Sequence, residues 1–145
     1  MHYFKKLQNN LIEAKNRGDC AAYIKYRTMR TSLGLFDKYR FKLMQHILGL
    51  RQNLGVVIDI GSNIGLMATF YRTASTILLY DLDAFTIRCA KMVLSGRENV
   101  SYIQANLKNI PCRTNTFDTV ISLETIEHIP PEEQKEVLND LIRIT

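Results

Sequence analysis

The residues with the clearest chemical potential lie in the segment Asp59-Ile60-Gly61-Ser62-Asn63-Ile64-Gly65. The segment follows an apolar run, which places its glycines in a strand-to-helix turn. Glycine lets a ligand lie against the backbone and leaves the N–H groups of the next helix free to bind it. A dinucleotide fingerprint would need glycine at Asn63 and Leu66, and the carboxylate of Asp59 disfavours a pyrophosphate. The turn therefore favours a cationic ligand.

A second carboxylate, Asp81, closes the next apolar run, 22 residues after Asp59. In dinucleotide-binding folds, an acidic residue about 20 residues beyond the glycine turn binds the ribose hydroxyls with its carboxylate. Asn106 closes the third run, and its amide can hydrogen-bond an adenine edge while Leu82 and Leu107 cover the adenine faces. These positions predict an adenosyl ligand, with ordinary turn residues as the alternative.

A third polar stretch, Glu124-Thr125-Ile126-Glu127-His128, follows the fourth apolar run. Two carboxylates and an imidazole can bind a metal, and the imidazole can also act as a general base. No histidine follows His128 in the sequence, so a site made of these three groups would be oxygen-rich and weak. We predict no metal and select His128 as the candidate catalytic residue, with a structural or substrate-facing role as the alternative.

Short apolar runs alternate with amphipathic stretches over residues 55–145. Residues 56–60 form a short, continuous, β-branched run, which is typical of a strand buried on both faces of a parallel sheet, and further apolar runs at 76–80, 100–103 and 117–123 predict strands. Helical spacing of apolar residues predicts helices over 64–72, over 84–95 and from residue 131 onward. The alternation predicts an α/β fold with a doubly wound, mainly parallel sheet.

The N-terminal third, residues 1–54, predicts three helices. Gly18 followed by Asp19 indicates a helix stop and a new N-cap. In the third helix the apolar residues at helical spacing are Phe36, Tyr39, Leu43, Ile47 and Leu50, and such a face is normally core. We therefore divide the chain into a helical cap over residues 1–54 and a cofactor-binding domain over residues 55–145.

Charge differs between these two parts. Residues 1–54 carry eleven Lys or Arg against three acids, a net charge of +8, whereas residues 55–145 carry a net charge of −3. A basic surface attracts nucleic acid, phosphate-bearing small molecules or an anionic membrane. The simpler interpretation is an ordinary solvated helix face.

The composition, 46% hydrophobic and 23% charged, suits a globular chain and excludes collagen-like or strongly disordered classes. No apolar run approaches the roughly 18 residues that cross a bilayer, and residues 1–10 lack the apolar segment of a signal peptide. The three cysteines, Cys20, Cys89 and Cys112, form no C-x-x-C pair and predict neither a disulfide framework nor a zinc site. The predicted location is the cytoplasm.

In their order along the chain, the strand-end motifs resemble those of the class I S-adenosylmethionine-dependent methyltransferases. The first motif of that family reads D-x-G-x-G-x-G, and Asp59, Gly61 and Gly65 match it while Asn63 replaces the middle glycine. Asp81 matches the family's ribose-binding acid. The resemblance covers residues 38–145 and implies a Rossmann-like fold.

The later motifs continue the resemblance. Asn106 falls where the family often has Asp beside the adenine amino group, and residues 117–122 resemble the F-D-x-V-x-S of the fourth strand. Residues 124–128 resemble the E-x-x-E-H stretch that follows it. In the small-RNA 2′-O-methyltransferases this stretch supplies metal ligands together with a downstream histidine, which this sequence lacks, and many small-molecule O-methyltransferases carry a similar stretch.

The resemblance implies methyl transfer from S-adenosylmethionine, with a small molecule as the first expectation for the acceptor. It assigns the methionine end to Asp59, Gly61, Ser62, Asn63 and Gly65, the ribose to Asp81, and the adenine to Leu82, Asn106 and Leu107. Because the cofactor has a net charge of about +1, two carboxylates favour it. The alternatives are an RNA 2′-O-methyltransferase with a metal site at Glu124, Glu127 and His128, an NAD-binding domain, and a non-catalytic domain.

The family's sheet has seven strands in the order 3-2-1-4-5-7-6, and this sequence supplies the first four. We expect the order 3-2-1-4 without the later strands, so that the fourth strand, which contains Phe117 and Val120, becomes an edge that pairs with another chain. The native gene is expected to continue past Thr145, with a naturally short, dimerising form as the alternative.

Overall fold

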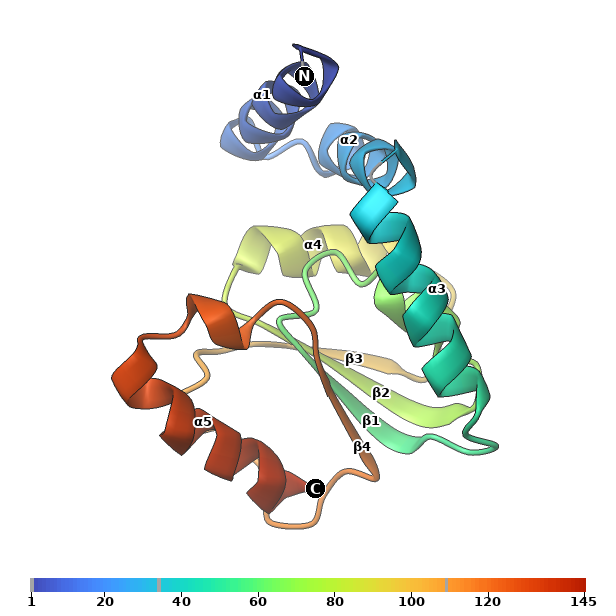
Figure 1. The fold of residues 1–145 in the computed structure, drawn as a ribbon, viewed down its shortest axis with the longest axis vertical. Coiled ribbons are helices and arrows are strands. Elements are labelled where there is room, and N and C mark those ends of the chain that lie inside the picture. Colours follow the sequence, from blue (N-terminus) through green and yellow to red (C-terminus); the bar gives the residue numbers. More distant parts are fainter. Residues whose placement is uncertain (1, 34, 109) are drawn as a thin grey trace.

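A computed structural model describes residues 2–33, 35–108 and 110–145. Parallel strands form one sheet in the order β3-β2-β1-β4 (Figure 1). The strands are β1 (Gly55–Ile60), β2 (Ala74–Asp81), β3 (Val100–Gln104) and β4 (Thr119–Ser122). The predicted α/β fold and strand order are therefore confirmed.

β1 lies inside the sheet, between β2 and β4. Successive β1 side chains enter different cores, because side chains alternate across a strand. Val57 packs in the core under α3 (Leu35–Gly49) and α4 (Ala84–Val93), whereas Ile58 packs in the core under α5 (Pro131–Ile144). Both side chains are fully buried, which explains why the strand is apolar at every position but one. Figure 1 shows the resulting arrangement, with α3 and α4 on one face of the sheet and α5 on the other.

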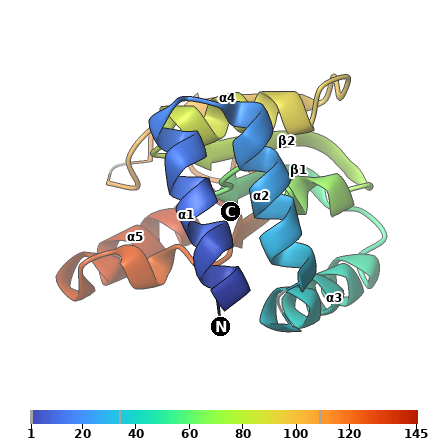
Figure 2. The same cartoon turned by 90° about the horizontal axis from the view of Figure 1, so that it is seen from above.

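The two N-terminal helices, α1 (His2–Asn16) and α2 (Cys20–Leu33), lie side by side above α4 (Figure 2). Between them Gly18 has a φ of +68°, and the carboxylate of Asp19 accepts the Ala22 N–H at 2.9 Å, as the predicted stop and cap require. The ring of Tyr23 meets that of Phe85 edge to face at 5.1 Å. This ring contact packs α2, and with it α1, against α4.

The cores cross the predicted boundary at residue 54. Leu48 of α3 shares a core with Val57, and Leu11 of α1 shares another with Ile64. The division into a cap and a cofactor-binding domain stays a prediction, and the packing shows that the two parts share their hydrophobic interiors.

In α3, the predicted apolar face points outward. Tyr39, Leu43, Ile47 and Leu50 are all exposed, and the side chain of Phe36 lies outside the described residues. Burial falls instead on the other side of the helix, where Leu48 is buried and Met44 is packed against the same core. The prediction that this face is core was wrong, because α3 is apolar on two sides and the other side meets the sheet.

The prediction of a helix over residues 64–72 was also wrong. The segment forms only one 3₁₀ turn, η1 (Met67–Phe70). The guanidinium of Arg97 donates to the carbonyl oxygens of Ala68, at 2.6 Å, and Tyr71, at 3.3 Å. In an α-helix the first of these carbonyls would accept a backbone N–H four residues on. Here the Ala68 carbonyl accepts the Tyr71 N–H of the 3₁₀ turn at 3.2 Å together with the guanidinium of Arg97, a side chain distant in sequence.

β4 lies at one end of the sheet and, in the described part of the chain, pairs with β1 alone. Association of this edge with another chain stays a prediction. None of the helices in the described residues is long and apolar enough to span a bilayer.

The central strand generates a prediction about stability. Ile58→Ala should lower the free energy of unfolding by about 2–5 kcal/mol, because it opens a cavity around a side chain with no exposed area. Ile142→Ala is the matched control, since Ile142 is 72% exposed, and it should change stability by less than about 0.5 kcal/mol. Urea titration of both variants measures the difference, and equal effects would contradict this packing.

Candidate functional site

A cavity of about 540 Å³ lies where β1 adjoins β2 on one side and β4 on the other. In open α/β sheets ligands bind outside the carboxyl ends of the strands at such a switch point. The cavity is lined by the turn after β1, the end of β2, the loop after β3 and the segment after β4. The predicted site residues that line it are Asp59, Gly61, Ser62, Asn63, Asp81, Leu82, Asn106, Leu107 and His128.

The turn after β1 passes three times through left-handed backbone conformations. Gly61, Asn63 and Gly65 have φ angles of +70°, +51° and +71°. A Cβ on Gly61 would lie 2.1 Å from the hydroxyl oxygen of Thr125, so this position accepts no side chain. Asn is among the few other residues that adopt this conformation readily, which explains how Asn63 stands where the motif has glycine.

Gly65 is the one predicted binding residue that does not line the cavity. A Cβ there would lie 3.0 Å from methyl groups of Leu79 and Leu94. The glycine therefore allows the turn to approach β2 and α4 closely, and its place in the structure is one of packing.

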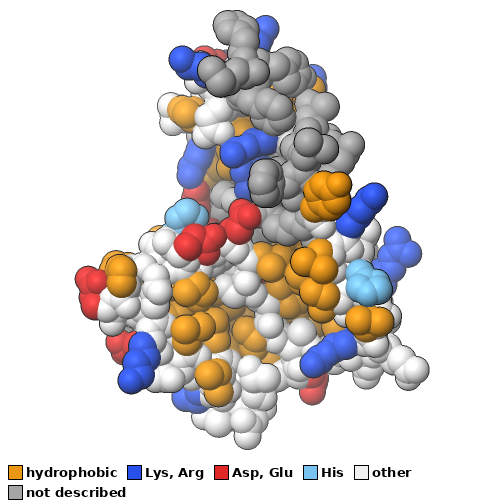
Figure 3. Space-filling view, viewed as in Figure 1, with side chains coloured by type: hydrophobic (Ala, Val, Ile, Leu, Met, Phe, Trp, Pro, Cys, Tyr) orange, Lys and Arg blue, Asp and Glu red, His pale blue; other side chains and the backbone are white. Residues whose placement is uncertain are grey.

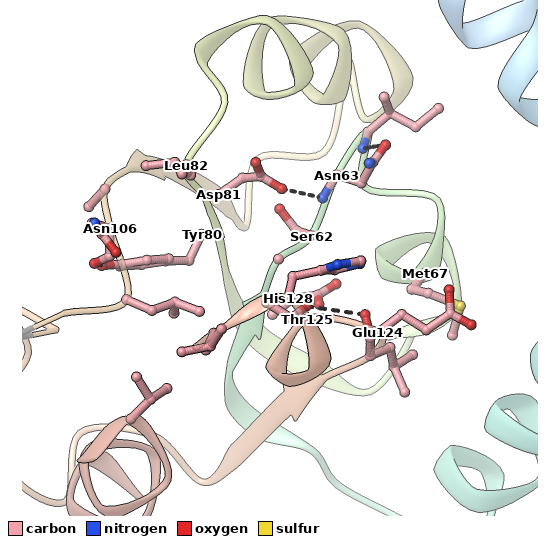
Figure 4. Close-up of a pocket in the computed structure, with 18 of the residues that line it drawn as sticks. Ser62, Asn63, Met67, Tyr80, Asp81, Leu82, Asn106, Glu124, Thr125 and His128 are labelled. Atoms are coloured by element: carbon pink, nitrogen blue, oxygen red, sulfur yellow. Dashed lines mark hydrogen bonds between the residues drawn. The ribbon is translucent and has the colours of Figure 1, made fainter. Parts of the chain in front are cut away.

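The carboxylate of Asp81 joins the ends of β1 and β2. One oxygen accepts the backbone N–H of Asn63 at 2.8 Å, and the other accepts the Asp83 N–H at 2.9 Å and the Thr86 hydroxyl at 3.1 Å. A carboxylate offers about four acceptor positions. These bonds orient Asp81 toward the cavity, where Figure 4 shows it beside Asn63 and Ser62, and leave acceptor capacity for a ligand.

Asp59 is buried, with 3% of its surface exposed, and its carboxylate accepts the Tyr71 hydroxyl at 2.9 Å. Burial raises the pKa of Asp59 to about 7, the Tyr71 hydrogen bond lowers it, and the nearby charge of Asp81 raises it further. The central strand therefore presents a carboxyl group that is protonated in part at neutral pH. A cation bound beside it would favour the ionised form.

Ser62 tests whether the cavity fits a polar ligand. Ser62 lines the cavity, and its buried hydroxyl has no hydrogen-bond partner among the described residues, as is also true of Ser122 outside the cavity. Buried polar groups in native proteins nearly always have a partner. The residues present therefore fit a polar ligand lying against this turn, as a cofactor with amino and carboxylate groups would.

The side of the cavity near β3 is more apolar. Leu82 lines it with 66% of its surface exposed, and Leu107 lies nearby in the same wall. The Tyr80 hydroxyl donates to the backbone carbonyl of Asn106, and the Asn106 side-chain oxygen accepts the Lys108 N–H at 3.2 Å. Asn106 thus lines the cavity and also closes its own turn, and its contact with an adenine stays a prediction.

The opposite side of the cavity contains Glu124 and His128, with Met67 beyond them (Figure 4). Glu124 has a φ of +52°, which is uncommon for this residue type. Glu127 does not line the cavity, so the three polar groups of this stretch do not converge there. Over the described residues, no group of three or more His, Cys, Asp or Glu is placed to hold a metal ion.

Several cavity or supporting residues were missed in the sequence. Tyr80 directly precedes Asp81, and Thr125 lies inside the E-x-x-E-H stretch, so both had a local signal. Tyr71, the partner of Asp59, had none, because it follows an irregular segment. Phe41 and Arg27 come from the helical cap and line the cavity from α3 and α2.

Comparisons with known proteins agree with this geometry. Residues 57–145 match a family model described as a methyltransferase domain. No curated protein sequence matches the chain.

Solved structures with the same fold include three informative cases. A proposed S-adenosyl-L-methionine-dependent methyltransferase from Methanococcus maripaludis is 18% identical, with a TM-score of 0.67 over 84% of this chain and 57% of its own. An S-adenosylmethionine-dependent methyltransferase from Aquifex aeolicus is 18% identical, with a TM-score of 0.59 over 72% and 57%. The PH0226 protein from Pyrococcus horikoshii is 24% identical, with a TM-score of 0.64 over 77% and 54%.

The chain spans about half the length of the solved structures that it matches. The family model covers residues 57–145, more than half of the chain, and the strand order β3-β2-β1-β4 matches the Rossmann-like methyltransferase structures. The chain therefore belongs to the methyltransferase domain family, and its sheet has the Rossmann-like fold of the class I enzymes.

Proposed function

We propose that the chain binds S-adenosylmethionine in the cavity after β1 and supports methyl transfer to an acceptor. The observation that carries the proposal is the convergence of two carboxylates and an unpartnered hydroxyl, from Asp59, Asp81 and Ser62, at one edge of the sheet. A cation with amino, carboxylate and ribose groups can use all three. Membership of the methyltransferase domain family supports the same conclusion.

Each wall of the cavity has a proposed task. Asp81 accepts hydrogen bonds from the ribose hydroxyls, and the exposed Leu82 packs against the adenine, with Leu107 and Asn106 beside it. The Ser62 hydroxyl binds the methionine end near the carboxylate of Asp59. The N–H groups of Gly61, Ser62 and Asn63, which the sequence predicted to be free, are already bonded within the protein and shape the turn. Gly65 contributes by allowing the close packing of that turn.

When bound, the cofactor supplies a methyl group on a sulfonium, which is already an activated leaving group. The protein must then align the acceptor and exclude water, an effect worth up to about 7–11 kcal/mol. Arg27 of α2, Phe41 of α3 and Met67 of η1 also line the cavity, and the sequence motifs assign none of them a task in cofactor binding. We assign the acceptor to these residues, with His128 accepting its proton.

A small-molecule acceptor remains the first expectation, because side chains from several elements line the cavity. An RNA acceptor with metal ligands at Glu124, Glu127 and His128 is less well supported, since Glu127 does not line the cavity. The cytoplasmic location stays a prediction.

The cofactor assignment predicts the effect of Asp81. Asp81→Ala should weaken binding of S-adenosylmethionine or its demethylated product by about 1–3 kcal/mol, because charge-assisted hydrogen bonds to the ribose are lost. Asp81→Asn removes the charge but keeps an oxygen that can accept the Asn63 N–H. Comparison of the two variants therefore separates the effect of the lost charge from the effect of a disturbed turn. Isothermal titration calorimetry measures all three proteins.

Asp83→Asn is the matched control for this experiment. Asp83 is a carboxylate two residues away whose side chain caps α4 by accepting the Phe85 N–H at 2.9 Å, and Asn is an equally good cap. This variant should bind the cofactor like the unmodified chain. Unchanged affinity in Asp81→Ala, or binding of NAD in place of the methyl donor, would overturn the assignment.

The raised pKa of Asp59 predicts a pH dependence of binding. A cationic ligand favours the carboxylate, so affinity should rise as pH increases through about 7, where burial places the pKa, and level off above it. Asp59→Asn should flatten this part of the profile. Calorimetric titrations at several pH values measure it, and parallel profiles for both proteins would contradict the prediction.

The stability of the ligand-free protein should show the opposite trend. Unfolded Asp59 loses its proton near pH 3.8, whereas the folded group retains it to about pH 7. The folded state therefore binds more protons between these values, and its free energy of unfolding due to Asp59 should fall as pH rises from about 4 to 7. Urea titrations of the unmodified chain and Asp59→Asn give this contribution by difference.

The proposed role of His128 as proton acceptor gives a separate prediction. It applies to a methyl acceptor that carries a proton on the atom that receives the methyl group. After a screen of extracts with labelled cofactor identifies such an acceptor, His128→Ala should lower its methylation rate about 10²–10⁴-fold, the usual contribution of a general base. Cofactor affinity should stay unchanged. Glu127→Gln, a neighbouring exposed residue outside the cavity, should leave both quantities unchanged. An undiminished rate in His128→Ala would refute the role.

A further inference from the structure

The outward side of α3 and the turn that follows it carry an apolar stripe. Tyr39, Leu43, Ile47 and Leu50 are 72%, 58%, 46% and 71% exposed, and their spacing of four, four and three residues puts them on one helix face. They make up four of the nine large hydrophobic side chains that are exposed in the described residues. We call these four residues the α3 stripe.

The α3 stripe is not a core face that happens to lie open. The other side of the same helix already packs against the sheet through Met44 and Leu48. Phe41 contacts Phe70 edge to face, with ring centroids 5.6 Å apart. Over the described residues, the helix therefore has one apolar side buried and a second one exposed.

Positive charge surrounds the α3 stripe. Residues 38–51 contain four Lys or Arg, one His and no acidic residue, and the side chains of Lys42, His46 and Arg51 are exposed. At the C-terminal end of α3, Arg51 and Arg72 line a shallow groove of about 390 Å³. Figure 3 shows hydrophobic and basic side chains gathered over the flank that α3 forms.

We propose that the α3 stripe docks this protein on the surface of an anionic lipid bilayer. A surface-bound helix places its apolar side chains at the boundary of headgroups and acyl chains, while Lys and Arg contact the anionic headgroups. The stripe supplies the first component, and the exposed Lys42 and Arg51, its neighbours in sequence, supply the second. Docking of this kind goes beyond methyl transfer and does not depend on it.

Other occupants fit these observations less well. Nucleic acid would match the charge, yet its phosphates offer no partner for four neighbouring apolar side chains. A second copy of the chain would cover the stripe, yet it would bring two basic rims together. Charge complementarity together with the apolar area therefore favours an anionic bilayer.

Docking through α3 also has a consequence for the cavity. Phe41, on the same helix, is one of the residues that line it. Binding of α3 to a bilayer would hold the cavity close to the lipid surface.

The chain contains no Trp, so a single introduced Trp reports on its own surroundings. Leu50→Trp replaces one exposed apolar side chain with another, and its fluorescence should shift to shorter wavelength when vesicles of equal parts phosphatidylcholine and phosphatidylglycerol are added. Ile142→Trp is the matched control, because Ile142 is 72% exposed on α5, away from the stripe. Its emission should not change, and neither probe should respond to pure phosphatidylcholine.

Loss-of-binding variants complete the test. In the Leu50→Trp background, Leu43→Ser with Ile47→Ser should weaken vesicle binding about tenfold or more, and Lys42→Glu should also weaken it. Leu138→Ser with Ile142→Ser on α5 should leave it unchanged. Circular dichroism confirms that each variant is folded.

Four results would overturn the proposal. They are an unchanged emission of the Leu50→Trp variant with anionic vesicles, equal shifts for both Trp probes, a shift with single-stranded RNA in place of vesicles, and a shift that depends on protein concentration without vesicles. The last two would identify RNA or a second copy as the occupant. Cofactor titration of Leu50→Trp is a separate measurement, so failure of either proposal is recognised independently.

Discussion

The structure depends on how tightly the chain is held as it leaves β1. The N–H groups of Gly61 and Ser62 donate to the Tyr80 carbonyl at 2.8 and 3.2 Å, which ties the turn to β2. On the other side, the Thr125 hydroxyl donates to the Ile60 carbonyl at 3.1 Å and occupies the space that a Cβ on Gly61 would need. The ends of β1, β2 and the segment after β4 are thereby joined around a single left-handed glycine. The cavity exists because this turn closes so sharply.

The sequence predicted those parts of the site that follow from strand ends. Asp59 and Asp81 were predicted because the carboxyl ends of parallel strands lie at one edge of the sheet. The two acids, 22 residues apart in sequence, therefore line the same cavity. The sheet order followed from the same regular alternation and from the family resemblance. What sequence reasoning captured is therefore the geometry that repeats with every βα unit.

The parts that were missed depend on contacts between distant residues. Arg97 takes carbonyl acceptors of the segment after β1, and no local pattern in residues 64–72 indicates this. Tyr71, at the end of the same irregular segment, donates its hydroxyl hydrogen to Asp59, and no local pattern indicates this contact either. In α3, periodicity identified an apolar face correctly but could not tell which of two apolar sides meets the sheet. That choice is made by the core around Leu48.

Asp59 shows why a site can be recognised by a local conflict. A buried carboxylate on a central strand opposes folding at neutral pH, and the single hydrogen bond from Tyr71 offsets only part of the cost, since the pKa remains raised to about 7. Valine or isoleucine would suit the strand better by every packing criterion. A cation bound at the proposed methyl-donor site would compensate for this burial, and Asp59 lines the cavity together with Ser62. The buried carboxyl group of Asp59, which opposes folding, is thus the same group that we propose to lie beside the methyl donor.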